Sequence, residues 1–156
     1  MIFLQIALAI VVASFIEWGI HKYILHGKKF GANKKSFWHY HWGEHHKNVR
    51  RQDYYEPDYL LPVYKYNAHF KEVLPLTGGA LMLIPLYFIA PVFSIYGWFH
   101  LVFYYLTHRY SHLKPEWGKR WFRHHYDHHM LKNQHANWCV TFPIADWIMG
   151  TRVKGN

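Results

Sequence analysis

VLPLTGGALMLIPLYFIAPVFSIYGWFHLVFYYLT, residues 73–107, is a run of 35 residues without Asp, Glu, Lys or Arg. As one helix it would extend roughly 50 Å, well beyond the ~30 Å hydrocarbon core of a bilayer. Pro85 and Pro91 lie near its middle, where proline interrupts helical hydrogen bonding. The stretch therefore predicts a hairpin of two short membrane-spanning helices, at about Val73–Phe88 and Val92–Thr107.

A second apolar stretch, Ile2–Ile20, is interrupted only by Gln5 and Glu17 and approaches the ~20 residues that cross a bilayer. All 18 Lys and Arg residues fall within 22–71 or 109–154, and basic segments beside spans stay on the cytoplasmic side. We therefore expect an all-α integral membrane protein with one domain over residues 1–156. It has three spans, an external N-terminus, and a cytoplasmic helical cap that includes the C-terminus.

The same charge pattern separates this chain from other classes of basic protein. A net charge of +9 would suit a nucleic-acid-binding protein, but its division around charge-free stretches is typical of membrane topology. We therefore expect no nucleic-acid partner. Cys139 is the only cysteine, which excludes an internal disulfide and a paired-cysteine metal motif. A soluble bundle with a buried hairpin is the alternative, and the length of the apolar stretches disfavours it.

Histidine is over-represented, with 15 residues in the chain. Two-thirds of them fall in four short clusters, at 21–26, 41–46, 108–112 and 125–129, which we call histidine boxes. The expected topology brings all four boxes to the cytoplasmic ends of the spans. The ten boxed residues are His21, His26, His41, His45, His46, His108, His112, His125, His128 and His129.

The spacing within most boxes places histidines on one face of a helix. His108 and His112 are separated by four residues, and the 125–129 box has spacings of three and four. In the 41–46 box we expect His41 and His45 to share a face, with His46 one step round. The 21–26 box differs, because a spacing of five puts its histidines about 140° apart on a regular helix. They share a site only if the helix end unwinds, which Gly27 would permit.

Ten clustered imidazoles exceed the needs of one metal ion and suit two ions with four or five ligands each. Imidazole binds iron, zinc, copper and nickel. The carboxylate set of soluble di-iron bundles is missing, so acidic residues are better placed to accept hydrogen bonds from the ligands' other ring nitrogens. The residues considered for this supporting role are Glu17, Glu44, Asp127, Asp146 and His135. Within the second box, His39 is an alternative to His41 as a ligand.

The order of boxes H-x4-H, H-x3-HH, H-x3-H and H-x2-HH resembles the fatty acid hydroxylase superfamily, which includes sterol desaturases and carotenoid hydroxylases. The resemblance extends from His21 to Thr151. It includes the segment NWCVTFPIADWIMGT at 137–151, which is similar to the family's ending after its last box. HKYILHG at 21–27 closely resembles the first box of bacterial β-carotene hydroxylases.

The resemblance implies a histidine-ligated pair of iron ions, with O₂ as co-substrate and zinc as a possible substitute in a structure. It implies hydroxylation or desaturation of a C–H bond in a membrane lipid such as a fatty acyl chain, sterol or sphingolipid. The electrons would come from a separate donor of the ferredoxin or cytochrome b5 type. The ligand pattern is common to both reactions and gives neither the lipid nor the oligomeric state.

Two alternatives to this function stay open. One is a carotenoid ring hydroxylase of the same superfamily. The other is a non-enzymatic membrane protein that binds or transports metal. Transport predicts ligands inside the spans near the midplane of the bilayer, whereas the boxes lie at the ends of the expected spans and only His100 lies within one.

Overall fold

The computed structural model describes residues 2–27, 33, 36–65 and 67–155. Within these residues it contains helices and no strand, which confirms the all-α prediction. In chain order the elements are α1 (Ile2–Ile20), the π-helix η1 (His21–Leu25), the π-helix η3 (His39–His45), α2 (His46–Arg51), the short 3₁₀ helix η4 (Pro57–Leu60), α3 (Ala68–Tyr87), α4 (Pro91–Leu113), α5 (Pro115–Trp121), α6 (Arg123–Met130) and α7 (Ile144–Ile148).

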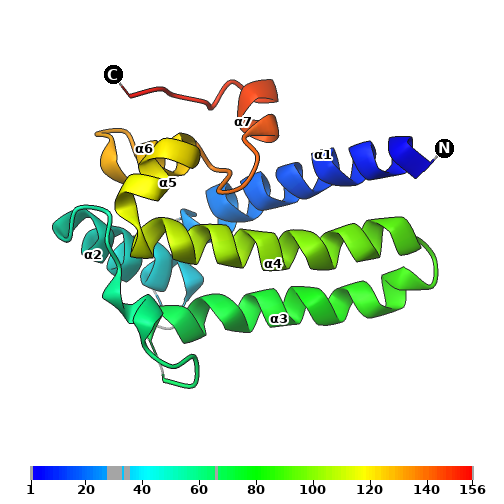
Figure 1. The fold of residues 1–156 in the computed structure, drawn as a ribbon, viewed down its shortest axis with the longest axis horizontal. Helices are drawn as coiled ribbons and strands as arrows, with labels where there is room; N and C mark the ends of the chain where they lie inside the picture. Colours follow the sequence, from blue (N-terminus) through cyan, green and yellow to red (C-terminus); the bar gives the residue numbers. More distant parts are fainter. Residues whose placement is uncertain (1, 28–32, 34–35, 66, 156) are drawn as a thin grey trace.

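Three long helices form the body of the molecule, and α4 lies between α1 and α3 (Figure 1). The N-terminus and the α3–α4 connection lie at one end of this layer. The short helices α2, α5 and α6 gather at the opposite end, where η1 continues α1. The histidine boxes lie on η1 and its C-terminal neighbour His26, on η3 and the start of α2, at the end of α4, and on α6, so the fold brings all four boxes to one end.

The helical hairpin forms as predicted, with its break before Pro91, whereas Pro85, also expected at the break, lies inside α3. Helix α3 ends at Tyr87, and Pro91 is the first residue of α4, where its missing N–H costs no helical hydrogen bond. Both helices are longer than expected at the histidine-bearing end. Helix α3 starts at Ala68, where the Asn67 side chain accepts a hydrogen bond from Phe70 N–H. Helix α4 continues to Leu113, so the 108–112 box is helical, as its spacing indicates.

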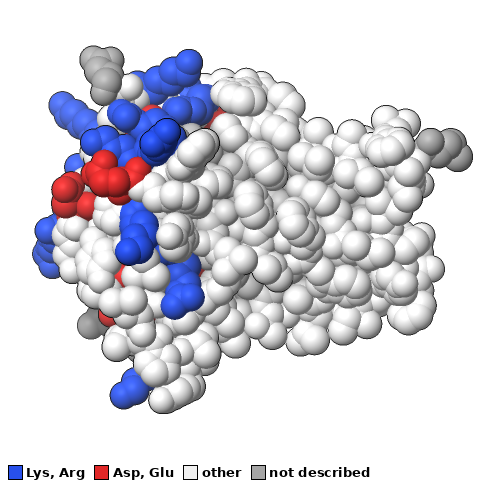
Figure 2. Space-filling model, viewed as in Figure 1, with Lys and Arg blue, Asp and Glu red and all other residues white. Residues whose placement is uncertain are grey.

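Charge is confined to one end of the molecule. Figure 2 shows Lys, Arg, Asp and Glu over the end that carries the short helices, and an uncharged surface over the rest of this face. Large apolar side chains cover the opposite end, where Phe3, Phe88 and Ile89 are each more than four-fifths exposed. Among the described helices, the continuous stretch Ile2–Leu25 is long and apolar enough on its own to cross a membrane. The two crossings by α3 and α4 remain a prediction.

The C-terminal segment packs against α1 and supports the histidine end. Trp18 of α1 forms a small core with Trp138, Cys139 and Ala145, all almost fully buried. The Asp146 carboxylate accepts hydrogen bonds from the backbone N–H groups of Trp138 and Cys139, at 2.9 and 2.8 Å. The backbone at 138–139 is therefore held by both apolar packing and a carboxylate, at the point where it meets the first histidine box.

Close packing at Gly118 gives a test of this arrangement. A Cβ atom at Gly118 would lie 2.8 Å from the Tyr54 ring and 3.0 Å from the Ser111 carbonyl oxygen. Gly118→Ala should therefore lower the free energy of unfolding by about 1–3 kcal/mol, because backbone must move to admit it. The measurement is the thermal unfolding midpoint of the purified protein in detergent.

Gly78→Ala is the matched control, because no atom lies within 4 Å of a Cβ atom at this helical position. It should raise stability by about 0.5–1 kcal/mol, since alanine loses less backbone entropy than glycine. Equal shifts for the two variants would contradict the packing at Gly118.

Candidate metal centre

The first histidine box lies on a π-helix that continues α1. Residues His21–Leu25 form this element, and the His26 N–H donates to the carbonyl oxygen of His21. A π turn closes its hydrogen bond over five residues, so a spacing of five brings the two side chains together. The expected unwinding of the helix end is thus replaced by a widening, and the two rings lie 5.1 Å apart.

The second box uses the same device. Residues His39–His45 form a π-helix, and the His46 N–H donates to the carbonyl oxygen of His41. His41 and His46 therefore point to one site, while His45 points to another. This differs from the expected pairing of His41 with His45, which assumed α-helical periodicity. His39 lies outside both groups, and its Nε2 faces Glu44 Oε1 at 3.6 Å, so the geometry favours His41 as the ligand.

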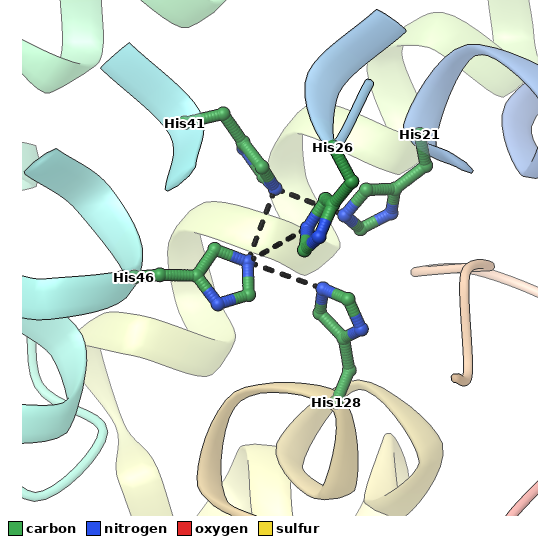
Figure 3. A group of neighbouring side chains, drawn as sticks. All are labelled: His21, His26, His41, His46 and His128. Atoms are coloured by element: carbon green, nitrogen blue, oxygen red, sulfur yellow. Dashed lines mark hydrogen bonds between the residues drawn. The ribbon is translucent and has the colours of Figure 1, made fainter. Parts of the chain in front are cut away.

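Five histidines from three segments form the first histidine group. Each offers a ring nitrogen, and all five nitrogens lie within 4.8 Å of one another. Figure 3 shows the rings converging, with neighbouring Nε2 atoms 2.9 to 3.2 Å apart. Two nitrogens bound at right angles to one ion, each at about 2.0–2.1 Å, would lie about 3 Å apart. The members of this group are His21, His26, His41, His46 and His128.

Four further histidines form the second histidine group, again with their ring nitrogens within 4.8 Å of one another. The tenth boxed residue, His125, lies beside it, with Nε2 3.3 Å from His112 Nε2. The two groups adjoin, because the rings of His46 and His129 stack at 4.2 Å. The members of the second group are His45, His108, His112 and His129. Nine of the ten boxed histidines thus fall into two groups, and the tenth is adjacent.

Backbone carbonyl groups orient several of these rings. His128 Nδ1 donates to Ala136 O at 2.7 Å, and His112 Nδ1 donates to Tyr54 O at 2.9 Å. His21 Nδ1 donates in the same way to the carbonyl oxygen of Trp138. Because a carbonyl only accepts, the ring proton of the neutral imidazole is on Nδ1, and Nε2 directs a lone pair into the group.

Burial keeps the histidine rings in their neutral, unprotonated form. His45, His128 and His129 are at most 1% exposed, and burial, reinforced by neighbouring histidines, lowers the pKa of each well below 6.5. The same causes lower the pKa values of His41 and His46. These side chains are therefore neutral at physiological pH, and the neutral imidazole is the form that binds metals.

Unpartnered nitrogens show that a cation fits this arrangement. The Nε2 atoms of His45, His108 and His129 are buried and have no hydrogen-bond partner within the described residues. Each such group left unsatisfied costs about 1–3 kcal/mol. In the first group, a proton satisfies one pair of nitrogens at a time, whereas a metal ion satisfies the converging lone pairs together. The donor set in each group suits a transition-metal ion.

Glu72 supports the second group, and sequence reasoning missed it. Its Oε1 accepts from His108 Nδ1 at 2.8 Å, and its Oε2 accepts from the buried Tyr59 hydroxyl. Glu56 is also buried, with Oε2 3.6 Å from His45 Nδ1. Neither residue lies near a box in the sequence. Glu72 stands beside Lys71 in a segment interpreted as a basic loop, and no local signal distinguishes it.

The acidic residues that were considered from the sequence do not bond the boxed histidines directly, and Asp146 acts through the backbone. Glu17 accepts hydrogen bonds from the backbone of residues 140–141 and faces His100 Nε2 at 3.3 Å. Glu44 bonds Lys71 at 2.6 Å, and Asp127 pairs with Arg123 and Arg152. Asp146 holds the backbone of Trp138, whose carbonyl orients His21.

His135 is exposed at the edge of the first group. Its ring stacks on Trp42 at 5.0 Å and lies 5.7 Å from the ring of His26. Next to His135 in the sequence, the side-chain amide of Gln134 lies 2.9 Å from Nδ1 of His46, another member of the first group. Residues 134–138 therefore border the first group along its outer side.

An apolar cavity of about 420 Å³ lies between α1, α3 and α4 and reaches both groups. His41 of the first group and His108 of the second line it, together with Tyr104. Its walls along the helices are formed mainly by apolar residues such as Ile16 and Leu76. The cavity therefore connects the apolar body of the molecule with the histidine end.

Two adjoining groups of buried neutral histidines, reached from an apolar cavity, form a candidate metal centre in an all-helical protein. The sequence model of the family described as fatty acid hydroxylase matches residues 6–151, and the chain belongs to this family. The family is membrane-associated and typically iron-dependent, and it suggests an oxidoreductase that acts on lipid. No curated protein and no solved structure gives a significant match to the chain.

The Glu72–His108 contact predicts a measurable effect on metal affinity. Glu72→Gln replaces the charged acceptor of the His108 Nδ1 proton and should weaken metal binding at the second group by about 10–100-fold, as loss of such partners commonly does. The measurement is release of bound metal to a colorimetric chelator at increasing chelator concentration.

Glu44→Gln is the matched control, because Glu44 bonds Lys71 and contacts neither group directly. It should leave the release curve unchanged. A Glu72→Gln protein that holds both ions as tightly as the wild type would contradict the supporting role of Glu72.

Proposed function

We propose that the protein is a di-iron oxygenase that uses O₂ to hydroxylate or desaturate a C–H bond of a membrane lipid. The observation that carries the proposal is the convergence of nine histidines into two adjoining groups at one end of an apolar cavity. Membership of the fatty acid hydroxylase family supports the same reaction class. A long apolar cavity suits an acyl chain, sterol or sphingolipid better than a polar substrate.

The histidine groups would hold one iron each. Two bound irons would supply the O₂ activation and electron storage that C–H oxidation requires. The protein would contribute by holding the histidine rings in position around the irons. Backbone carbonyls fix the rings of His21, His112 and His128, and the carboxylate of Glu72 holds the proton on His108 Nδ1. His125, beside the second group, completes the set of ten proposed ligands.

The cavity would bind the lipid and aim it at the metals. His41 of the first group and His108 of the second both line the cavity, so a lipid carbon bound beside them would lie close to both groups. Pro75, Gly79 and Leu83 lie along the α3 side and Ala13, Ile16 and Ile20 along the α1 side. These surfaces exclude water from the reacting carbon, which protects the oxidising power of the site from side reactions.

We further propose the topology that the charges indicate. Helices α1, α3 and α4 would cross the bilayer, with the N-terminus and the α3–α4 connection outside and the histidine end in the cytoplasm. The confinement of charge to one end supports this orientation. A lipid would then enter laterally between α1 and α3, whose residues line the cavity on either side of α4.

Cysteine labelling tests this topology. Ile89, between α3 and α4, is 83% exposed, and Asn133 is exposed at the histidine end. Ile89→Cys should react with a membrane-impermeant maleimide on intact cells, whereas Asn133→Cys should react only after permeabilisation. The native Cys139 gives no background, because it is fully buried. Labelling of both variants from the same side would refute the hairpin crossing.

Lipid analysis tests the reaction. Cells that express the protein should contain a lipid that has gained one oxygen atom or lost two hydrogen atoms. The purified protein should carry about two metal ions, one for each histidine group. His128→Ala should abolish the product and lose about one ion, because the first group then lacks a nitrogen that its ion needs. Mass spectrometry measures both the lipids and the metals.

His69→Ala is the control for this experiment. His69 is also buried, at 7% exposed, but it bonds Leu61 O and belongs to neither group. It should retain both ions and most of the product. Product formation by the His128→Ala protein with both ions bound would overturn the proposal. Two ions without any lipid product would favour the non-enzymatic metal-binding alternative.

A further inference from the structure

Two rings, Trp42 and His135, link the first histidine group to the molecular surface. Trp42 lies against two members of that group, with ring centroids 4.8 Å from His26 and 5.1 Å from His46. On its other side it stacks with the exposed ring of His135, at 5.0 Å and an interplanar angle of 27°. A continuous series of packed rings therefore runs from solvent to the first group.

The rings around the second group reach the surface less openly, because the outermost of them, Tyr104 and Tyr126, are half-buried, whereas His135 is exposed. The second group's non-histidine ring neighbours include Tyr54 and Tyr59, and both are 0% exposed. The two groups do contact each other through the stacked rings of His46 and His129, at 4.2 Å. A charge that enters at Trp42 thus reaches the first group directly and the second group through one further ring contact.

Exposed basic residues lie on the two segments that carry Trp42 and His135. Lys47 and Arg50 are exposed on α2, which begins at His46, and Lys132 is exposed three residues before His135. Arg50 also bonds the carbonyl oxygens of His129 and Leu131, which places its guanidinium beside the loop that carries His135. The acidic residue nearest to Trp42 in sequence, Glu44, is paired with Lys71. Basic residues therefore outnumber acidic ones on the segments that carry the ring series.

We propose that the Trp42–His135 surface, with Lys47, Arg50 and Lys132 on the same two segments, is the docking site of an acidic one-electron carrier protein. Opposite charge would steer the carrier to this face and fix its orientation. One electron would leave the carrier's redox centre, which is oxidised, and would reduce a metal ion held by the first group. No atom is transferred, and the role of the rings is to shorten the distance that the electron crosses between the carrier and the first group. The inference rests on the proposed function, because only a redox enzyme needs the carrier.

Binding is tested first, without turnover. Isothermal titration uses the metal-loaded protein in detergent with three probes: a plant-type [2Fe–2S] ferredoxin and cytochrome b5 as acidic carriers, and cytochrome c as a basic one. At least one acidic carrier should bind, with affinity that falls as salt is raised, and cytochrome c should not bind.

Lys132→Glu should weaken binding about tenfold, which corresponds to about 1.4 kcal/mol. Lys65→Glu makes the same charge change on an exposed residue before α3 and should leave binding unchanged.

Electron transfer is tested second, by stopped-flow reduction without lipid. At a carrier concentration that saturates binding, Trp42→Leu should slow metal reduction by the carrier at least tenfold, while reduction by dithionite stays as in the wild type. Trp121→Leu removes another exposed tryptophan, 62% exposed, and should change neither rate. Equal weakening by Lys132→Glu and Lys65→Glu, or an unchanged rate in Trp42→Leu, would overturn the proposal. Metals that even dithionite does not reduce would instead refute the proposed function.

Discussion

The arrangement of unprotonated imidazole nitrogens is the constraint on which the rest of this structure depends. Nitrogen lone pairs that face one another at 2.9 to 3.2 Å are unfavourable unless a positive charge lies among them. The surrounding structure enforces the arrangement by removing water and by bonding Nδ1 atoms outward to carbonyl oxygens. Apolar packing at the C-terminal segment, the carboxylate of Glu72 and the π-helices all serve to hold rings in positions that they would otherwise leave.

The two π-helices show how the backbone meets this demand. An α-helix places residues four apart on one face, and a spacing of five would direct two side chains away from each other. Widening by one residue aligns His21 with His26 and His41 with His46. The same widening leaves His45 free to join the other group, so a single short segment supplies both sites. π-helical turns are rare and concentrate at functional sites, and here the reason is visible in the ligand spacing.

Much of this arrangement could be predicted from the sequence. Proline positions gave the break in the hairpin, and spacing within the boxes identified the histidines that converge. The division of the second box between two groups was not predictable from α-helical periodicity, because the π geometry depends on tertiary contacts. Glu72 could not be found either, since its partner His108 is 36 residues away and on another helix. Local pattern reveals which residues are candidates, whereas long-range packing decides how they pair.

The contact between His21 and the backbone of Trp138 spans 117 residues of the chain. Glu17, one turn earlier, reaches a similar distance to bond the backbone of Val140. Synthesis runs from the N-terminal side, so the two histidines of the 21–26 box, which follow α1, lack these supports until residues 138–140 have been made. Closing so long a loop carries a large entropic cost that only the final contacts offset. The topology therefore favours an order of assembly in which the long helices form first and the first histidine group is enclosed last, when the C-terminal segment packs against α1.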